Sequence, residues 1–153
     1  MSGVSRIQFA EVIAAPVGRV YELMIGPGSY PQWTSAFAEG CYFEGSWATG
    51  ARIRFLAPPG DGMVAEVAEH RPCEFISIRH LGVIASGVED TGSDAVRAWA
   101  PAYENYTFAA VPGGTRLVVD MDVAPEWEAS MREAWPMALR RLKALCEAQE
   151  ATA

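Results

Sequence analysis

Hydrophobic residues recur every three or four positions near the C-terminus, between residues 126 and 148. This spacing places them on one stripe of a helix. At about 1.5 Å per residue, such a helix is roughly 35 Å long. A stripe of that length needs a broad apolar surface as its partner. The residues of the stripe are Trp127, Met131, Trp135, Ala138, Leu139, Leu142, Leu145 and Cys146.

Upstream of this helix, apolar and polar residues alternate in several short runs, as in half-buried strands. Breaks rich in glycine and proline separate most of the runs, so neighbouring strands are expected to pair antiparallel. Two short helices are predicted after the first strand, starting near Pro16 and Ser29. The predicted strands are 5–14, 41–47, 51–57, 63–70, 74–81, 102–110 and 115–123.

One connection is much longer than the others and runs from residue 82 to residue 101. Its second half, residues 93–99, predicts a short helical turn capped by Ser93. Loops of this length in a compact domain are often functional, although a plain surface loop is the alternative.

Together these elements predict an α+β fold over residues 1–153, as a single domain. A curved antiparallel sheet of about seven strands, in the order β-α-α-β6-α, wraps around the long C-terminal helix. A chain of 153 residues is long enough to bury a core of this kind.

The alternation also predicts which residues of neighbouring strands face each other. Opposite residues of an antiparallel pair have a constant sum of residue numbers. If one pair is fixed in the core, the others follow. The expected pairs are Ile76 with Phe108, Ile78 with Tyr106, and His80 with Glu104.

His80 and Glu104 are therefore the one acid–base pair that this register brings together. They are candidates to orient a ligand hydroxyl or carbonyl, or to act as general acid and base. The alternative is a solvent-exposed pair at the strand ends. The other histidine, His70, follows Glu69 at a strand end and is expected at the surface.

Charge and cysteine content exclude several functions. A formal net charge of −7 disfavours nucleic acid as a partner. Three widely spaced cysteines, with no C-x-x-C pair, predict no metal site and favour a reducing, cytoplasmic location. No apolar run is long enough to predict a membrane span or a signal peptide. We expect no cofactor.

Short motifs in a characteristic order resemble the START/SRPBCC superfamily of helix-grip proteins, which includes the birch pollen allergen and polyketide cyclases. They are residues 15–21 (APVGRVY), 30–33 (YPQW) and 135–139 (WPMAL). Residues 87–90 (GVED) and 99–106 (WAPAYENY) are similar to a bacterial subgroup related to the activator of the heat shock protein 90 ATPase. The resemblance implies a cavity between sheet and helix for apolar small molecules or lipids.

The predicted function is binding of a hydrophobic small molecule or lipid in that cavity, rather than catalysis. The alternatives are a cyclase, dehydratase or hydrolase-like enzyme that uses His80 and Glu104, and a protein-interaction module that regulates a chaperone. Pairing with a second copy of the chain stays open, and so does an aromatic core with no cavity. The expected ligand-binding residues are Trp33, Phe37, Phe55, Met63, Ile76, Ile78, His80, Trp99, Glu104, Tyr106, Phe108, Trp127, Met131 and Trp135.

Overall fold

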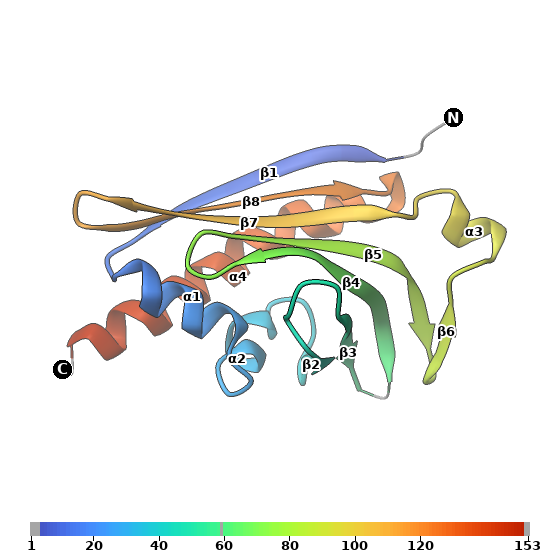
Figure 1. The fold of residues 1–153 in the computed structure, drawn as a ribbon, viewed down its shortest axis with the longest axis horizontal. Coiled ribbons are helices and arrows are strands. Elements are labelled where there is room, and N and C mark those ends of the chain that lie inside the picture. Colours follow the sequence, from blue (N-terminus) through green and yellow to red (C-terminus); the bar gives the residue numbers. More distant parts are fainter. Residues whose placement is uncertain (1–3, 59, 152–153) are drawn as a thin grey trace.

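The computed structural model describes residues 4–58 and 60–151. A strand, two short helices, a run of strands and one long helix follow one another, which confirms the predicted α+β helix-grip architecture (Figure 1). The elements are β1 (Ser5–Ile13), α1 (Val17–Ile25), α2 (Tyr30–Thr34), β2 (Tyr42–Gly45), β3 (Arg52–Ala57), β4 (Asp61–Arg71), β5 (Phe75–Ala85), β6 (Val88–Asp90), α3 (Asp94–Arg97), β7 (Ala102–Val111), β8 (Gly114–Val123) and α4 (Pro125–Ala151).

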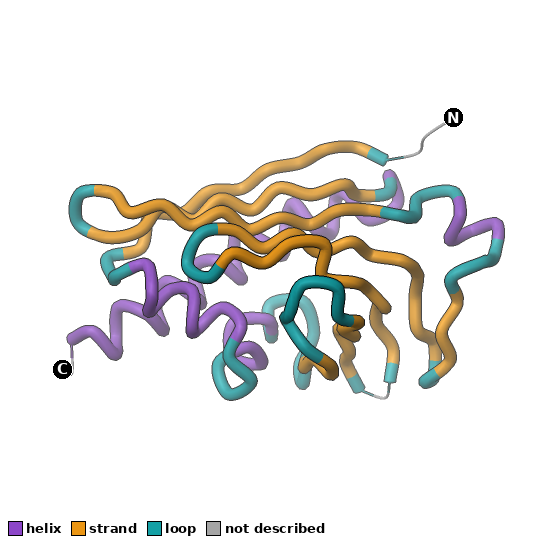
Figure 2. The backbone as a smooth tube through the Cα atoms, in the orientation of Figure 1, coloured by secondary structure: helices purple, strands orange, loops and turns teal. Residues whose placement is uncertain are grey.

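The described strands form one antiparallel sheet in the order β1-β8-β7-β5-β4-β3-β2, with β6 paired to β5. Figure 2 shows them as one curved layer, with α3 at the far end of the molecule from α1. The helices α1, α2 and α4 pack against one another, and α4 also packs against β1. The sheet and these three helices enclose the core.

The sheet has eight strands, one more than predicted, because β6 lies inside the connection expected to be a loop. Strand β5 runs on to Ala85 and returns at Val88 through a two-residue turn. The turn residues Ser86 and Gly87 have φ angles of 52° and 82°, the left-handed values that a tight hairpin needs. The predicted helical turn is confirmed as α3, and the Val96 amide donates to Ser93 Oγ at 3.3 Å.

The predicted register between β5 and β7 is wrong by two residues. Ile76 lies opposite Tyr106, Ile78 opposite Glu104, and His80 opposite Ala102. No tight turn joins these two strands, so turn geometry could not fix their register. A shift of two residues keeps every side chain on its predicted face, because the side-chain period of a strand is two.

The predicted stripe on α4 is buried only in its second part. Trp135, Ala138, Leu139, Leu142 and Cys146 are buried in the core cluster. Before Trp135 the stripe is less buried: Trp127 is 52% exposed, whereas Met131 is half-buried and packs against the core cluster. The first ten residues of α4 therefore contribute no buried side chain, and the helix is anchored by the part that follows.

Candidate functional site

A polar network of two buried side chains and one half-buried side chain lies on β5 and β7. The Nε2 atom of His80 lies 2.9 Å from Glu104 Oε1, and the Tyr106 hydroxyl donates to Glu104 Oε2. The predicted contact between His80 and Glu104 is thus present, as a diagonal contact rather than between directly opposite residues. His80 is only 7% exposed, so the alternative of an exposed pair at the strand ends is wrong for this residue.

The protons of this network can be assigned from its geometry. Burial, with the nearby Glu104 adding to it, raises the pKa of Tyr106 well above its usual value, so its hydroxyl stays a donor. An ionised carboxylate only accepts hydrogen bonds, so His80 Nε2 must donate to Glu104. The other ring nitrogen, His80 Nδ1, is buried and has no hydrogen-bond partner among the described residues.

Aromatic rings from helices and strands contact this network. Trp135 of α4 lies in ring contact with Phe9, Trp33, Phe37 and Tyr106, at centroid distances of 6.4, 5.8, 5.0 and 6.2 Å. A second group centres on Tyr30, which contacts Phe43 at 5.2 Å and Phe55 at 6.2 Å. Phe55 in turn contacts the His80 ring at 5.8 Å. The polar network therefore meets the aromatic cluster at Phe55 and Tyr106.

Most of the predicted ligand-binding residues gather in or around this core. Trp33, Ile76, Ile78, His80, Tyr106, Phe108 and Trp135 are buried. Phe37, Phe55, Met63, Glu104 and Met131 are half-buried. The exceptions are Trp127, which is exposed, and Trp99, which lies elsewhere.

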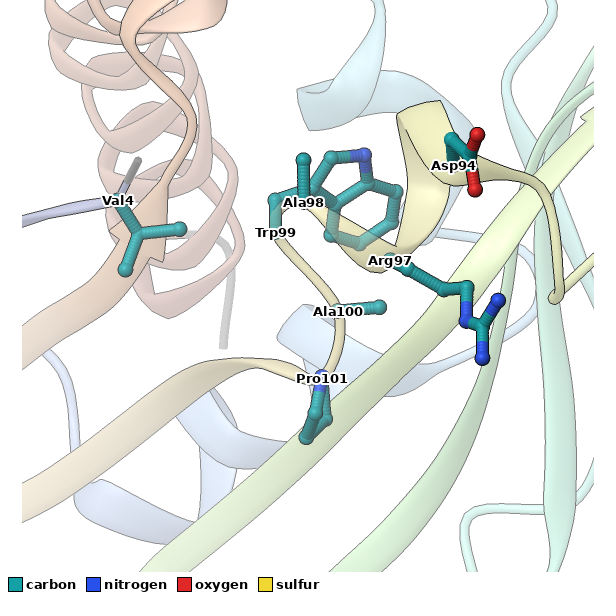
Figure 3. A pocket seen from close by; sticks show the side chains of 7 residues that line it. All are labelled: Val4, Asp94, Arg97, Ala98, Trp99, Ala100 and Pro101. Atoms are coloured by element: carbon teal, nitrogen blue, oxygen red, sulfur yellow. The ribbon is translucent and has the colours of Figure 1, made fainter. Parts of the chain in front are cut away.

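Trp99 borders an open surface pocket of about 600 Å³ between the start of β1 and α3. In Figure 3, Val4 approaches it from one side, while α3 and the segment after it form the other. The remaining lining residues are Asp94, Arg97, Ala98, Ala100 and Pro101. Trp99 therefore borders a surface pocket instead of the predicted cavity under the long helix.

Trp47 is a residue of this region that sequence reasoning missed. It follows β2 and contacts Phe43 at 5.3 Å and Phe55 at 5.7 Å. Its indole Nε1 is buried and has no hydrogen-bond partner among the described residues. A large aromatic residue between two glycines, Gly45 and Gly50, was the available signal.

The second histidine, His70, has both ring nitrogens occupied. Its Nε2 lies 2.6 Å from the Tyr21 hydroxyl and its Nδ1 lies 2.7 Å from the Trp47 carbonyl oxygen. The expectation that His70 lies at the surface is wrong, since it is half-buried and joins α1 to the segment between β2 and β3. The carbonyl requires a donor, so Nδ1 carries the hydrogen and Tyr21 donates to Nε2.

In the described part of the chain, no three His, Cys, Asp or Glu side chains gather where they could hold a metal ion. Cys41, Cys73 and Cys146 are free thiols, and burial raises the pKa of Cys146 to about 11. Over the described residues, no helix is both long and apolar enough to cross a membrane.

Comparison with known proteins agrees with this architecture. Residues 14–147 match the family described as Activator of Hsp90 ATPase homolog 1-like protein. No curated protein sequence matches the chain.

Three solved structures illustrate the likeness in fold. A protein from Mesorhizobium loti has a TM-score of 0.72 at 16% identity, with 94% of this chain and 97% of that chain covered. The Aha1 dimer from Colwellia psychrerythraea has a TM-score of 0.72 at 16% identity, with 94% and 96% covered. A protein of the dynemicin biosynthetic locus has a TM-score of 0.66 at 22% identity, with 96% of this chain but 48% of that chain covered. At these identities the likeness shows the fold alone.

Proposed function

The chain belongs to the Activator of Hsp90 ATPase homolog 1-like family, and from this premise and the geometry of the site we propose that it binds a small, largely apolar molecule between the sheet and the helices α2 and α4. The ligand would lie against Phe55 and Tyr106, where the aromatic cluster meets the polar network. The half-buried residues Phe37, Met63 and Met131 would let the ligand enter. The two methionine side chains are flexible and can adapt their shape to a bound molecule.

The observation that carries this proposal is the buried Nδ1 atom of His80. A buried polar atom without a partner destabilises the fold, and such atoms are rare in native proteins. Glu104 holds the imidazole by its other nitrogen, so the orientation of Nδ1 is fixed. A bound molecule that hydrogen-bonds to Nδ1 would recover this loss of stability. The arrangement therefore fits a polar anchor in an otherwise apolar site.

A second candidate function, proton transfer to or from the bound molecule, is favoured by the same arrangement. A carboxylate that holds one imidazole nitrogen fixes the tautomer and leaves the other nitrogen as a base. In this chain Glu104 would be the positioning residue and His80 the base. Glu104→Gln, which keeps the shape of the side chain, would separate the two functions: a loss of turnover with binding retained supports catalysis.

A docking role on a protein partner has less support in this chain. Large hydrophobic side chains that are exposed include Val12, Tyr42, Val88, Trp127 and Met137, and they come from four different elements, β1, β2, β6 and α4. A protein interface usually gathers such side chains in one patch.

Two further properties follow as proposals. The Colwellia psychrerythraea relative was solved as a dimer, so we propose that this chain also pairs, which light scattering after size-exclusion chromatography would check. The three free thiols support a reducing cytoplasmic location.

The experiment that tests ligand binding uses naphthalene as a neutral apolar probe and follows methionine methyl groups by NMR. We expect the signals of Met63 and Met131 to shift and that of exposed Met137 to stay. Phe55→Ala should lower the naphthalene affinity about fivefold, the size of one aromatic contact. Phe75→Ala, a half-buried phenylalanine under Arg71, is the matched control. Absence of naphthalene binding by the wild-type protein would overturn the proposal.

A further inference from the structure

Trp47 presents a second buried polar atom, and its ring shares the neighbour Phe55 with His80. The rings of both residues contact Phe55, at centroid distances of 5.7 Å and 5.8 Å. Both Trp47 Nε1 and His80 Nδ1 are buried and lack a hydrogen-bond partner among the described residues. Two such atoms around one phenyl ring are unusual, because buried polar side-chain atoms are nearly always paired.

Trp47 is also held firmly in place. Its backbone carbonyl accepts from His70 Nδ1 at 2.7 Å, and its ring packs against Phe43. His70 is tied in turn to Tyr21 of α1. The indole is therefore positioned by contacts that leave its N–H group unused, as expected for a group that serves a ligand.

The two atoms have opposite hydrogen-bonding characters. An indole N–H can only donate. A neutral imidazole that donates through Nε2 can only accept at Nδ1, and Glu104 takes the Nε2 hydrogen. With the imidazole neutral, the complementary molecule offers an acceptor to Trp47 and a donor to His80. An anionic group next to His80 is disfavoured, since Glu104 carries the same charge.

On the basis of the proposed function, we infer that Trp47 is a further binding residue of the site and that the ligand is a flat, apolar molecule with a carbonyl-type acceptor for Trp47 and a hydroxyl or N–H donor for His80. Phe55, which contacts both rings, would provide a surface for the flat body of the ligand. Hydroxylated aromatic ketones and molecules of similar polarity belong to this chemical class.

Four probes with the same apolar body test the inference: naphthalene, 2-acetonaphthone with the acceptor only, 2-naphthol with the donor at one end, and 6-hydroxy-2-acetonaphthone with both groups. For the wild-type protein we expect each added group to raise the affinity about fivefold, the typical effect of one hydrogen bond to a buried partner. Affinities can be measured by tryptophan-fluorescence quenching and by ligand-observed NMR.

Two variants assign the groups to residues. Trp47→Phe keeps an aromatic ring and removes the N–H, so it should abolish the gain from the acetyl group and keep the gain from the hydroxyl group. His80→Gln keeps a donor near the Nε2 position for Glu104 and removes the Nδ1 acceptor, so it should do the reverse. Tyr42→Phe, at an exposed position of β2, is the control and should keep both gains.

The outcomes separate this inference from the function on which it rests. If naphthalene binds but all four probes have equal affinity, the assignment of Trp47 and His80 is wrong and the proposed binding function stands. If naphthalene fails to bind, the proposed function itself is wrong. The comparison of four probes on the wild-type protein decides the inference even if a variant fails to fold.

Discussion

The two histidines of the chain occupy similar places but differ in one respect. Each is on a strand of the sheet, is at least half-buried, and contacts an aromatic ring: Tyr21 for His70 and Phe55 for His80. Among the described residues, His70 pairs through both ring nitrogens, whereas His80 pairs through Nε2 alone. A fully paired histidine needs no explanation beyond packing. The unpaired nitrogen of His80 is the reason for proposing a binding site around it.

The two sites also differ in the charge of their partners. The partners of His70 are a hydroxyl and a carbonyl group, which are neutral. The partner of His80 is the carboxylate of Glu104, which also accepts from Tyr106. A charged partner holds an imidazole more strongly than a neutral one. His70 therefore joins α1 to the segment between β2 and β3, whereas the bond from His80 Nε2 to Glu104 fixes the orientation of the unpaired Nδ1 atom.

The largest expected effect is the loss of Glu104. Glu104→Ala leaves both His80 Nε2–H and the Tyr106 hydroxyl without a partner in a buried place, so the free energy of unfolding should fall by about 3 kcal/mol. Urea denaturation followed by circular dichroism would measure it. Glu66→Ala, which breaks a partly exposed ion pair with Arg79, should cost less than about 1 kcal/mol. Equal losses in the two variants would show that the buried network has no special role.

A smaller effect should distinguish the two histidines directly. The side-chain amide nitrogen of glutamine can take the place of histidine Nε2, but glutamine has no atom at the position of Nδ1. His70→Gln should therefore lose the bond to the Trp47 carbonyl and cost about 1 to 2 kcal/mol of stability. His80→Gln keeps the bond to Glu104 and removes an unpaired atom, so it should cost less than about 0.5 kcal/mol.

Paired urea denaturation curves of these two variants and the wild-type protein provide the measurement. A larger stability loss for His80→Gln than for His70→Gln would contradict the comparison, because it would mean that Nδ1 of His80 contributes to the fold.

Sequence periodicity was enough to predict the fold and most element boundaries. It succeeded because strands and helices that bury one face must repeat at two or about 3.6 residues. It missed β6, since a strand of three residues, of which Val88 is 68% exposed, has no buried alternation to detect. It also placed Trp127 in the core, although the helical spacing alone cannot show where a helix extends past its partner surface.

The candidate site was predictable only in part. Alternation placed His80 and Glu104 on one face, and that conclusion survived an error of two residues in register. The roles of Trp47 and His70 were not predictable, because they depend on a contact between a turn and a distant strand. Likewise, an unpaired nitrogen is a property of three-dimensional packing, and no residue type or spacing encodes it.

The smallest expected effect concerns alkaline pH and compares Tyr106 with Tyr21. The pKa of Tyr106 is raised well above its usual value, mainly by burial, and that of half-buried Tyr21 is also raised by burial, though less. A raised pKa means that the unfolded chain loses its phenolic proton first as pH rises. The stability from each tyrosine is therefore complete below about pH 10 and decreases as pH rises towards the folded pKa.

At pH 10 this loss is about 0.4 kcal/mol for a tyrosine that stays fully protonated in the folded protein. Tyr106→Phe should remove this contribution, so the variant should lose less stability than the wild-type protein between pH 8 and pH 10. Tyr21→Phe should reduce the loss by a smaller amount, because Tyr21 begins to ionise in the folded protein at lower pH than Tyr106. Urea midpoints measured at half-unit pH steps would resolve the difference. If the two variants showed the same pH dependence, Tyr106 would be no better shielded from water than Tyr21, and the contrast between the proposed binding site and the structural link at His70 would lose its electrostatic support.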